Sequence, residues 1–397
     1  MVGQTRTRIA PLAIALALLA AGALAWLAVA RHHAPTTRPT LPATPSDFGK
    51  VFAAAKGGET ILLAPGNYGS FAGAVKPAVV TIRAQRQTTA RMALRFAAVA
   101  NLRIEGLTID GAEIAGLSRG VTIADSTFRQ AIVIHADRMA HAGVVLDGNR
   151  LAHIDVCPKC YEGRVQIVGD SGRPSGIVVR NNTFGPGGNA DGIQDEGNAV
   201  QILDNTFKGI RQGGPHSRHS DALQLYGQRN TVVRGNYFRD VATAIMAPDG
   251  GDHELIEHNV FDTGGYPYAI MLGGDDGSVI RHNTLPDLGG CAYDQPCGTL
   301  LIGPGPKGDA SRGTVVQDNV LGQLSLSGGS TLGADRHNLI ATAGGGPADR
   351  VGRPLLAGGA HPASRSAFAL AGGSPGSGAA SDGTDVGIAQ AAARHER

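Results

Sequence analysis

The chain has 397 residues, of which 58 are glycine and only 5% are aromatic. A conventional globular core draws much of its buried area from aromatic side chains, so this balance favours a fold of many short strands and turns. The formal net charge is +2, and the chain has no concentrated basic stripe, which argues against a nucleic-acid partner.

The first thirty residues differ in composition from the rest. Arg6 and Arg8 precede an apolar run from Ile9 to Ala30, and Ala28-Val29-Ala30 fits the small-x-small pattern of a signal-peptidase site. The run is also long enough to cross a bilayer as a helix. Residues 1–30 therefore predict either a cleaved signal peptide or an uncleaved N-terminal membrane anchor. Because the arginines hold the N-terminus inside, both alternatives predict a secreted or periplasmic protein, tethered through residues 9–30 if uncleaved.

The next segment, 31–46, is rich in Pro and Thr and is typical of a flexible linker. The four cysteines fit an oxidising compartment. Cys157 and Cys160 form a CPKC motif, and Cys291 and Cys297 frame the loop CAYDQPC. A zinc site would need the two pairs to meet in space, and a redox CxxC would need a βαβ context. Two local disulfides are the simpler expectation.

A short pattern then recurs: a β-branched apolar strand, a polar residue, Asn, a Thr, Val or Tyr, and a Phe or Leu. It occurs at 144–151, 177–184, 200–207, 231–238, 254–261, 278–285 and 314–321, with degenerate copies at 101–109 and 120–128. The repeated asparagines are Asn149, Asn182, Asn205, Asn236, Asn259, Asn283 and Asn319. Their spacing alternates between a coil of about 22–24 residues and longer intervals that hold a loop, as in solenoid proteins.

Strands this short can bury a face only by stacking on one another, which makes a continuous core. We expect the Asn at the corner of each coil to take left-handed geometry and to form an internal ladder with its neighbours. The Phe or Leu two residues later should form a stacked apolar column. Leucine-rich repeats would need a leucine-dense consensus and usually a helix per turn, and neither occurs. The pattern predicts an all-β fold, a parallel β-helix.

A second repeated strand precedes each Asn strand. It reads ADGIQ at 190–194, SDALQ at 220–224, TAIM at 243–246, YAIM at 268–271 and TLLI at 299–302. Each coil should therefore contain this first strand, a turn of variable length, the Asn strand and corner, a third strand and a loop.

On these motifs the chain resembles the pectate-lyase-like superfamily of right-handed parallel β-helices, which includes polysaccharide lyases, uronate epimerases and some glycoside hydrolases. Residues 47–71 look like the superfamily's start, a short capping helix followed by the first strand. Residues 368–388 are similar to its closing segment, in which Ser-Pro is followed by Asp-x-Gly. The resemblance implies a right-handed parallel β-helix domain over residues 47–389, followed by a tail at 390–397.

In the resembled families the binding cleft runs along the first strand of each coil. Asp191 and Asp221 occupy like positions one coil apart, where stacked strands lie about 4.8 Å from each other. Two such carboxylates should interact strongly, so that one holds a proton or both share a cation. Thr243 and Tyr268 follow at that position, so the acidic pair departs from the repeat. The alternative is a purely structural ladder, and strict alternation cannot place Asp191 and Gln194 on the same face.

Polar residues gather around this pair over four consecutive coils. The residues expected to bind substrate are Gln194, Gln224, Glu196, His253 and Tyr268. Further polar residues in these loops are Asp252, Asp275 and Asp276.

The resemblance implies uronate chemistry, which needs a neutralised carboxylate, a base for the C5 proton and an acid for the leaving oxygen. His219 has a suitable ordinary pKa for the base, Tyr226 could serve as the acid, and Arg218 could neutralise the substrate. His216, Asp191 and Asp221 complete the expected catalytic set. Hard oxygen ligands for Ca²⁺ would come from Asp191, Asp195, Asp221 and Asp249.

The sequence thus predicts an extracytoplasmic, monomeric polysaccharide lyase that cleaves an acidic, uronate-containing polysaccharide by β-elimination. A C5-epimerase would use the same groups, and a glycoside hydrolase could use Asp191 and Asp221 as paired carboxylates. A non-catalytic glycan-binding or adhesin β-helix is the remaining alternative. It draws support from the absence of lysine between Lys208 and Lys307, because lyases of this superfamily often use Lys or Arg as base.

Overall fold

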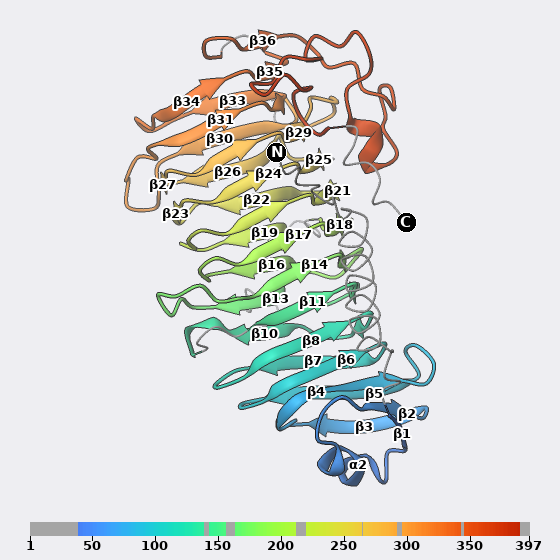
Figure 1. Cartoon of the computed structure of the whole chain (residues 1–397). Coiled ribbons are helices and arrows are strands. Elements are labelled where there is room, and N and C mark those ends of the chain that lie inside the picture. The colour runs from blue at the N-terminus through green and yellow to red at the C-terminus, as the bar shows by residue number, and fades with distance from the viewer. Residues whose placement is uncertain are drawn as a thin grey trace, which may run out of the picture. The chain divides into compact units, whose positions relative to one another are not determined.

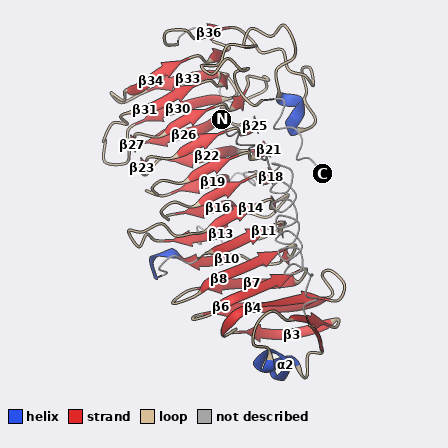
Figure 2. Ribbon diagram, in the orientation of Figure 1, coloured by secondary structure: helices blue, strands red, loops and turns tan. Residues whose placement is uncertain are grey.

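The computed structural model describes residues 39–138, 143–155, 163–211, 220–263, 265–291, 296–342 and 345–389. Within Thr40–Arg397 the described strands stack coil upon coil along one axis, and the pairings between successive coils are parallel (Figure 1). Strands dominate the described chain, with very little helix (Figure 2). The right-handed parallel β-helix predicted from the sequence is confirmed.

One sheet of 13 strands carries the second strand of each coil. Its strands, in stacking order, are β1 (Thr40–Ala43), β2 (Thr60–Leu63), β4 (Val75–Ala84), β6 (Ala100–Glu105), β8 (Arg119–Ala124), β11 (Val144–Asp147), β14 (Val178–Arg180), β17 (Gln201–Leu203), β20 (Val232–Arg234), β24 (Leu255–Glu257), β28 (Val279–Arg281), β31 (Thr314–Gln317) and β34 (Leu332–Arg336).

The other large sheet contributes two further stacks, joined through β7. The stack of first strands comprises β3 (Gly66–Phe71), β5 (Ala90–Phe96), β7 (Thr108–Ile114), β10 (Ile132–His135), β13 (Gly163–Val168), β16 (Asp191–Asp195), β19 (Asp221–Leu225), β22 (Thr243–Ala247), β26 (Tyr268–Gly273), β30 (Thr299–Gly303) and β33 (Gln323–Leu326). The stack of third strands comprises β9 (Thr127–Phe128), β12 (Arg150–Leu151), β15 (Thr183–Phe184), β18 (Thr206–Lys208), β21 (Tyr237–Val241), β25 (Val260–Thr263), β29 (Thr284–Leu285), β32 (Val320–Leu321), β35 (Leu339–Ile340) and β36 (Arg350–Val351). A small pair, β23 (Gly251–Asp252) and β27 (Asp275–Asp276), joins two neighbouring turns.

Helical structure is confined to short segments. The helix α2 (Phe48–Ala54) lies at the N-terminal end of the stack, where Phe52 packs edge-on against Phe71 with ring centroids 4.9 Å apart. Two 3₁₀ turns, η1 (Ala136–Arg138) and η2 (Arg365–Phe368), lie farther along the chain. In the described part of the chain no helix is long and apolar enough to span a membrane. The predicted signal or anchor segment, 9–30, lies outside the described residues.

The predicted linker at 31–46 is too long. Thr40–Ala43 forms β1 and pairs in parallel with β2, so the first strand of the solenoid begins inside that range. The Pro/Thr composition misleads here because Pro42 sits on the terminal strand of the sheet, where a missing backbone donor is tolerated.

The internal asparagine ladder is present. Asn205 Oδ1 accepts hydrogen bonds from the backbone N–H (2.9 Å) and the side-chain amide (3.0 Å) of Asn182, one coil earlier. The Asn205 amide in turn donates to Asn236 Oδ1 at 3.0 Å. The ladder begins at Ser126 and continues through Asn338, one coil beyond the predicted set. Each rung satisfies buried polar groups that would otherwise destabilise the core.

The prediction that the ladder asparagine itself has left-handed geometry is wrong. The residue before it has that geometry. Positive φ angles occur at Asn181 (56°), Asp204 (52°) and His258 (55°), each directly preceding a ladder Asn. The two roles are separate because the left-handed residue turns the chain at the corner, while the ladder side chain must point inward to reach the next coil.

The apolar column two residues after each ladder Asn is also present. The rings of Phe184, Phe207, Phe238 and Phe261 stack nearly parallel, with successive centroids 4.7, 4.9 and 4.8 Å apart. All four side chains are buried, and Leu285 and Leu321 extend the column. Asn ladder and Phe column together fix the register of the coils around the site.

The C-terminal segment returns along the outside of the stack. Phe368 meets the ring of Tyr237 with centroids 6.0 Å apart, and Ile388 N donates to Thr284 Oγ1 at 2.9 Å. Ser381 binds Asp318 through its N–H and hydroxyl, both at 2.7 Å. The predicted closing segment therefore covers the third-strand side, away from the first strands.

Candidate functional site

The two acidic first strands, β16 and β19, are neighbours in the stack. Ile193 lies opposite Leu223 and Gln194 opposite Gln224. Asp221 N donates to Asp191 Oδ1 at 2.8 Å, so the Asp191 carboxylate lies directly against the next coil. Successive coils thus bring the predicted acidic pair together, with Asp191 8% exposed and Asp221 fully buried.

Asp191 and Gln194 meet although they are three residues apart. Gln194 Nε2 donates to Asp191 Oδ2 at 2.9 Å, and both residues are 8% exposed. The objection that both ends of Asp-x-x-Gln cannot share a face does not hold at this strand, because the two side chains bond to each other. The Asp191 carboxylate is thereby held from two directions.

Tyr226 follows β19 and lies within electrostatic reach of four carboxylates. Partial burial is the main cause that raises its pKa to about 12, and the charges of Asp191, Asp249, Asp221 and Glu196 raise it further. The phenol therefore keeps its proton at physiological pH. In the protonated form the phenol can act only as a proton donor, as an unperturbed phenol also would at this pH.

Asp195 is a correction to the sequence prediction. Its side chain is fully buried, with Oδ1 accepting from Gly197 N (2.8 Å) and Oδ2 accepting from Thr231 Oγ1 (2.9 Å). Burial raises its pKa to about 6 despite these bonds. Asp195 is therefore part of the interior of the turn rather than a calcium ligand in the cleft.

The other residues predicted to bind substrate differ in how they lie relative to Asp191 and Asp221. Gln224 is 3% exposed and follows Gln194 in register, whereas Glu196 is partly buried and accepts from Gly169 N at 2.8 Å. His253 is exposed and bonds to Asp252, which raises its pKa. Tyr268, three coils above Asp191, packs on Tyr266 with ring centroids 5.7 Å apart.

Three predicted catalytic residues, His216, Arg218 and His219, fall in 212–219, outside the described residues, and so do Cys157 and Cys160. Their roles stay predictions. The other predicted disulfide, Cys291–Cys297, is formed.

Arg164 belongs to the site although no sequence motif marks it. It is fully buried on β13 and donates to the backbone carbonyls of Gly187, Ala190 and Asp191, the last at 3.1 Å. Burial lowers its pKa to about 10, although the charges of Asp191 and Asp155 oppose this, so it remains a cation at neutral pH. It places a positive charge behind the acidic strand and fixes the loop that leads into it. One signal in the sequence could have indicated Arg164. The positions in register with it in the next two coils are Gly192 and Ala222, so a charged residue there is unusual.

The fit to calcium is poor. Among the residues that the structure describes, no three His, Cys, Asp or Glu side chains converge to hold a metal ion. Asp195 is buried in its turn and holds Gly197 N and Thr231 Oγ1, so it does not join Asp191, Asp221 and Asp249 as a fourth ligand. We assign no step to a metal ion.

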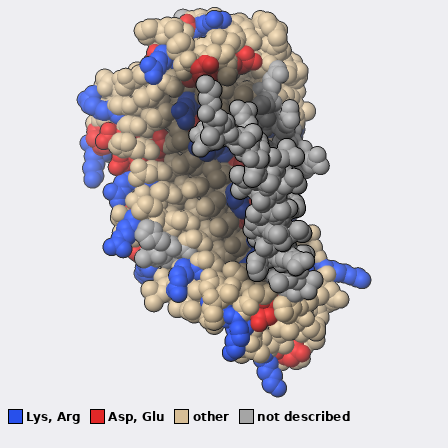
Figure 3. All heavy atoms as spheres, viewed as in Figure 1, with Lys and Arg blue, Asp and Glu red and all other residues tan. Residues whose placement is uncertain are grey.

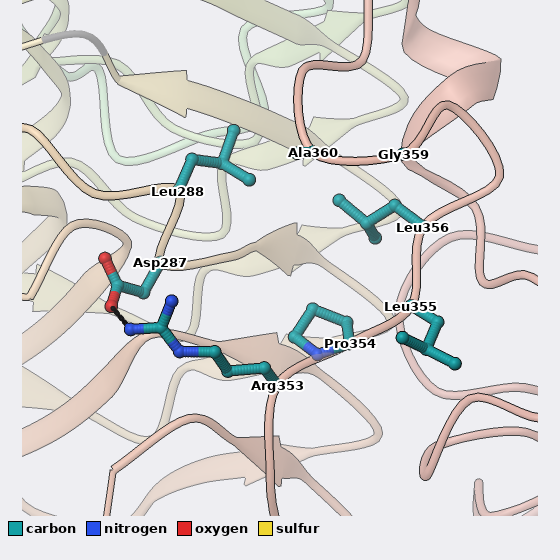
Figure 4. A pocket seen from close by; sticks show the side chains of 8 residues that line it. All are labelled: Asp287, Leu288, Arg353, Pro354, Leu355, Leu356, Gly359 and Ala360. Atoms are coloured by element: carbon teal, nitrogen blue, oxygen red, sulfur yellow. Dashed lines mark hydrogen bonds and ion pairs between the residues drawn. The ribbon is translucent and has the colours of Figure 1, made fainter.

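A hollow of about 340 Å³ lies elsewhere, in later coils. It is lined by Asp287, Leu288, Arg353, Pro354, Leu355, Leu356, Gly359 and Ala360 (Figure 4). Arg353 Nη2 donates to Asp287 Oδ2 at 3.2 Å across one side, and the remaining lining is mostly apolar. On the face shown in Figure 3 the visible charged side chains lie mainly toward the margins. Neither feature resembles a groove for a polyanion.

No protein-family model matches the chain, and no curated protein matches its sequence. Solved structures do match its fold. An arginine-to-alanine variant of the PL6 family alginate lyase AlyGC has a TM-score of 0.58 at 14% identity, covering 88% of this chain and 56% of that one. The alginate lyase AlyF-OU02, solved as a complex, has a TM-score of 0.53 at 14% identity, with 77% and 79% covered.

A PL6 family polysaccharide lyase from Pseudopedobacter saltans has a TM-score of 0.52 at 14% identity, covering 79% of this chain and 87% of that one. The chain spans only about half the length of AlyGC. The predicted resemblance to the pectate-lyase-like β-helices is thus confirmed for the fold.

Proposed function

We propose that the protein is a polysaccharide lyase that cleaves a uronate-containing polysaccharide by β-elimination at the face formed by β16 and β19. The observation that carries the proposal is the pairing of Asp191 and Asp221 on successive first strands, with Tyr226 following the second of them. The alginate lyases with the same fold act on a substrate of this kind, which supports the choice of substrate class.

In β-elimination the leaving oxygen must receive a proton as the glycosidic bond breaks. Tyr226 is the proposed donor, because its hydroxyl is protonated at physiological pH and it follows β19, near the carboxylates of Asp191 and Asp221. The base that removes the C5 proton is proposed to be His219, two residues before Asp221 in the chain.

The substrate is an anion, and the carboxylates around Tyr226 would repel it unless positive charge offsets them. Arg164 supplies one buried cation behind Asp191. Arg218 is proposed to neutralise the substrate carboxylate, which makes the C5 proton more acidic.

The test is an assay on alginate, polygalacturonate and other uronate polysaccharides, with and without Ca²⁺, that follows the absorbance of unsaturated uronate products. Tyr226→Phe should lower kcat by about 10²-fold or more, because it removes only the proton donor. Tyr68→Phe is the matched control. Its hydroxyl bonds to Ala43 O and Ala64 O at the N-terminal end of the stack, so its loss should leave kcat unchanged.

Absence of product from every polymer, with and without Ca²⁺, would exclude the lyase. Exchange of the C5 proton in D₂O without chain shortening would instead identify an epimerase. Glycan binding that survives in His219→Ala and Asp221→Ala, with no turnover in the wild type, would identify a non-catalytic binding protein.

We also propose that the protein is exported through residues 1–30. The formed Cys291–Cys297 disulfide fits an oxidising compartment. Fractionation and N-terminal sequencing test this. A mature chain that begins after Ala30 supports cleavage, a full-length chain in the membrane fraction supports an anchor, and a full-length chain in the cytoplasm contradicts export.

A further inference from the structure

A second polar column runs inside the solenoid, through the turns between the first and second strands. Its members sit at the two ends of each turn. They include Asp195 with Thr231, then Gln228 and Glu254, then Asp275 with Ser278, and finally Ser311 and Thr314. Unlike the Asn ladder, this column contains carboxyl groups.

The centre of the column is a group of three side chains from two adjacent coils. Ser278 Oγ lies 2.6 Å from Glu254 Oε2 and 2.5 Å from Asp275 Oδ1. Thr314 Oγ1 donates to Asp275 Oδ2 at 2.5 Å, and Asp252 N donates to Glu254 Oε1 at 3.0 Å. Glu254 is 1% exposed and Asp275 is 2% exposed.

The two short contacts of Ser278 Oγ require one more proton than the serine hydroxyl supplies. The Ser278 hydroxyl carries a single proton, and it already accepts a hydrogen bond from Glu254 N at 3.0 Å. It can therefore donate to one carboxyl group only. The second short oxygen–oxygen contact is a hydrogen bond only if the other carboxyl group carries a proton and donates it to Ser278.

The surroundings favour the neutral form. Inside the turns the facing side chains are uncharged, namely Gln228, Ser311 and Thr314, and within the described chain the Gln228 amide makes no hydrogen bond of its own. Charged groups of the same turns lie on the outside: Asp252, His253 and Asp276, together with Arg229 and Arg312, which bridge to these strands. No cation faces the pair from the interior of the described turns.

Burial raises the pKa of Glu254 to about 7, and the charge of Asp275 adds to the shift. Burial likewise raises the pKa of Asp275. Both directions agree with the geometry, since ionising the second carboxyl group would place two like charges in the apolar interior.

We propose that Glu254 and Asp275 share one proton through Ser278, and that losing this proton as the pH rises loosens the two turns that β23 and β27 join. The device is independent of the proposed enzymatic activity. It makes the stability of this section of the solenoid depend on pH.

The direction of the effect follows from linkage. A carboxyl group whose folded pKa lies above its unfolded value contributes its full stabilisation below the unfolded pKa, near 4.5 for Glu. That stabilisation falls as the pH rises through the folded value and is gone above it. The sensitive window is therefore about pH 5 to 8.

Glu254→Gln tests the proposal, because the amide supplies a permanent proton donor to Ser278 and cannot ionise. Thermal unfolding midpoints of wild type and variant are compared from pH 5 to pH 8. The midpoint of the variant minus that of the wild type should increase by about 3 °C or more between pH 5 and pH 8. Other carboxyl groups with raised pKa values, such as Asp195, act equally in both proteins and cancel in the difference.

Glu257→Gln is the matched control. Burial alone would raise the pKa of Glu257, but hydrogen bonds and charges from Arg281 and Arg234 together hold it below its ordinary value. This variant should lower the midpoint by the same amount at pH 5 and pH 8, because Glu257 stays ionised throughout.

A Glu254→Gln difference that stays constant from pH 5 to pH 8 overturns the proposal. If that variant does not fold, Asp275→Asn replaces it with the same expectation. If neither folds, hydrogen exchange of the wild type decides. Protection of 249–253 and 274–278 that falls from pH 5 to pH 8, after correction for intrinsic exchange, supports the proposal, and unchanged protection overturns it.

Discussion

Two neighbouring sections of the solenoid share one architecture and differ in the polarity of their first strands. In β16 and β19 the first strands carry Asp191, Gln194, Asp221 and Gln224. In the next coils, Thr243 stands opposite Asp221, Met246 opposite Gln224 and Met271 opposite Met246. The Asn ladder and the Phe column pass through both sections without interruption.

The difference shows where this fold leaves room for function. Interior positions of the first strand, such as Ile193, Leu223, Ile245 and Ile270, are apolar in every coil, because stacking demands it. The positions that change hold Asp221 and Gln224 in one coil and Thr243 and Met246 in the next, and in β16 and β19 these polar side chains are buried. Polar residues confined to two coils are therefore better candidates for chemistry than polar residues that repeat.

The largest expected effect on activity comes from replacing an acidic residue of β19 with the residue that the next coil has at the same position. Asp221→Thr copies the residue that the following coil has in register, so the fold should persist. We expect kcat/KM on the uronate substrate to fall at least about 10²-fold, because Thr keeps the backbone contact to Asp191 but removes one of the two paired carboxylates near Tyr226. Steady-state kinetics measure the loss, with circular dichroism to confirm the fold.

Asp262→Thr is the control for this comparison, since it removes a partly buried carboxylate from β25, a third strand. Its activity should equal that of the wild type. Full activity in Asp221→Thr would show that the Asp221 carboxylate is not needed for catalysis.

The shared framework predicts equal effects in the two sections. Asn205 lies in the acidic section and Asn259 lies beyond it, and the side chain of each makes four ladder hydrogen bonds that replacement by Ala removes. Each replacement should lower the free energy of unfolding by about 2–4 kcal/mol, because buried donors and acceptors lose their partners. Denaturant unfolding measures both losses. A large difference between the two free energies would show that the ladder does not stabilise the two sections equally.

The fold could be predicted from the sequence because its main determinants repeat. The Asn and Phe positions recur once per coil, and the structure places them in the ladder and the stacked column. The left-handed corner was assigned to the wrong residue, because that position varies among Asn, Asp, Gly and His and shows no single-residue signal. Asn338 was missed because it lies in the last coils, where the flanking pattern weakens.

The site was predicted less completely, for reasons that particular residues illustrate. Alternation from the buried Ile193 would have placed Asp195 inside the turn, but its position beside Glu196 suggested a polar loop. The contacts of Arg164 are backbone carbonyls of another coil, which no motif reveals. The pairing of Glu254 with Asp275 depends on register between two turns, and the sequence shows both only as isolated acids.

The smallest expected effect concerns Gln224, the buried glutamine that follows Gln194 in register. Gln224→Met copies Met246 and should raise KM about threefold to tenfold with little change in kcat, because it removes a polar contact next to Asp191 but leaves Tyr226 intact. Met271→Gln, the reverse change outside the acidic section, should alter neither constant. An equal rise in KM from both variants would mean that substrate extends along the later coils as well.

The most direct test of the proposed site is a crystal structure of the protein soaked with an oligouronate. We predict density across β16 and β19, with a glycosidic oxygen within hydrogen-bonding distance of the Tyr226 hydroxyl. Density at another place, such as the hollow between Asp287 and Ala360, with none along β16 and β19, would contradict it.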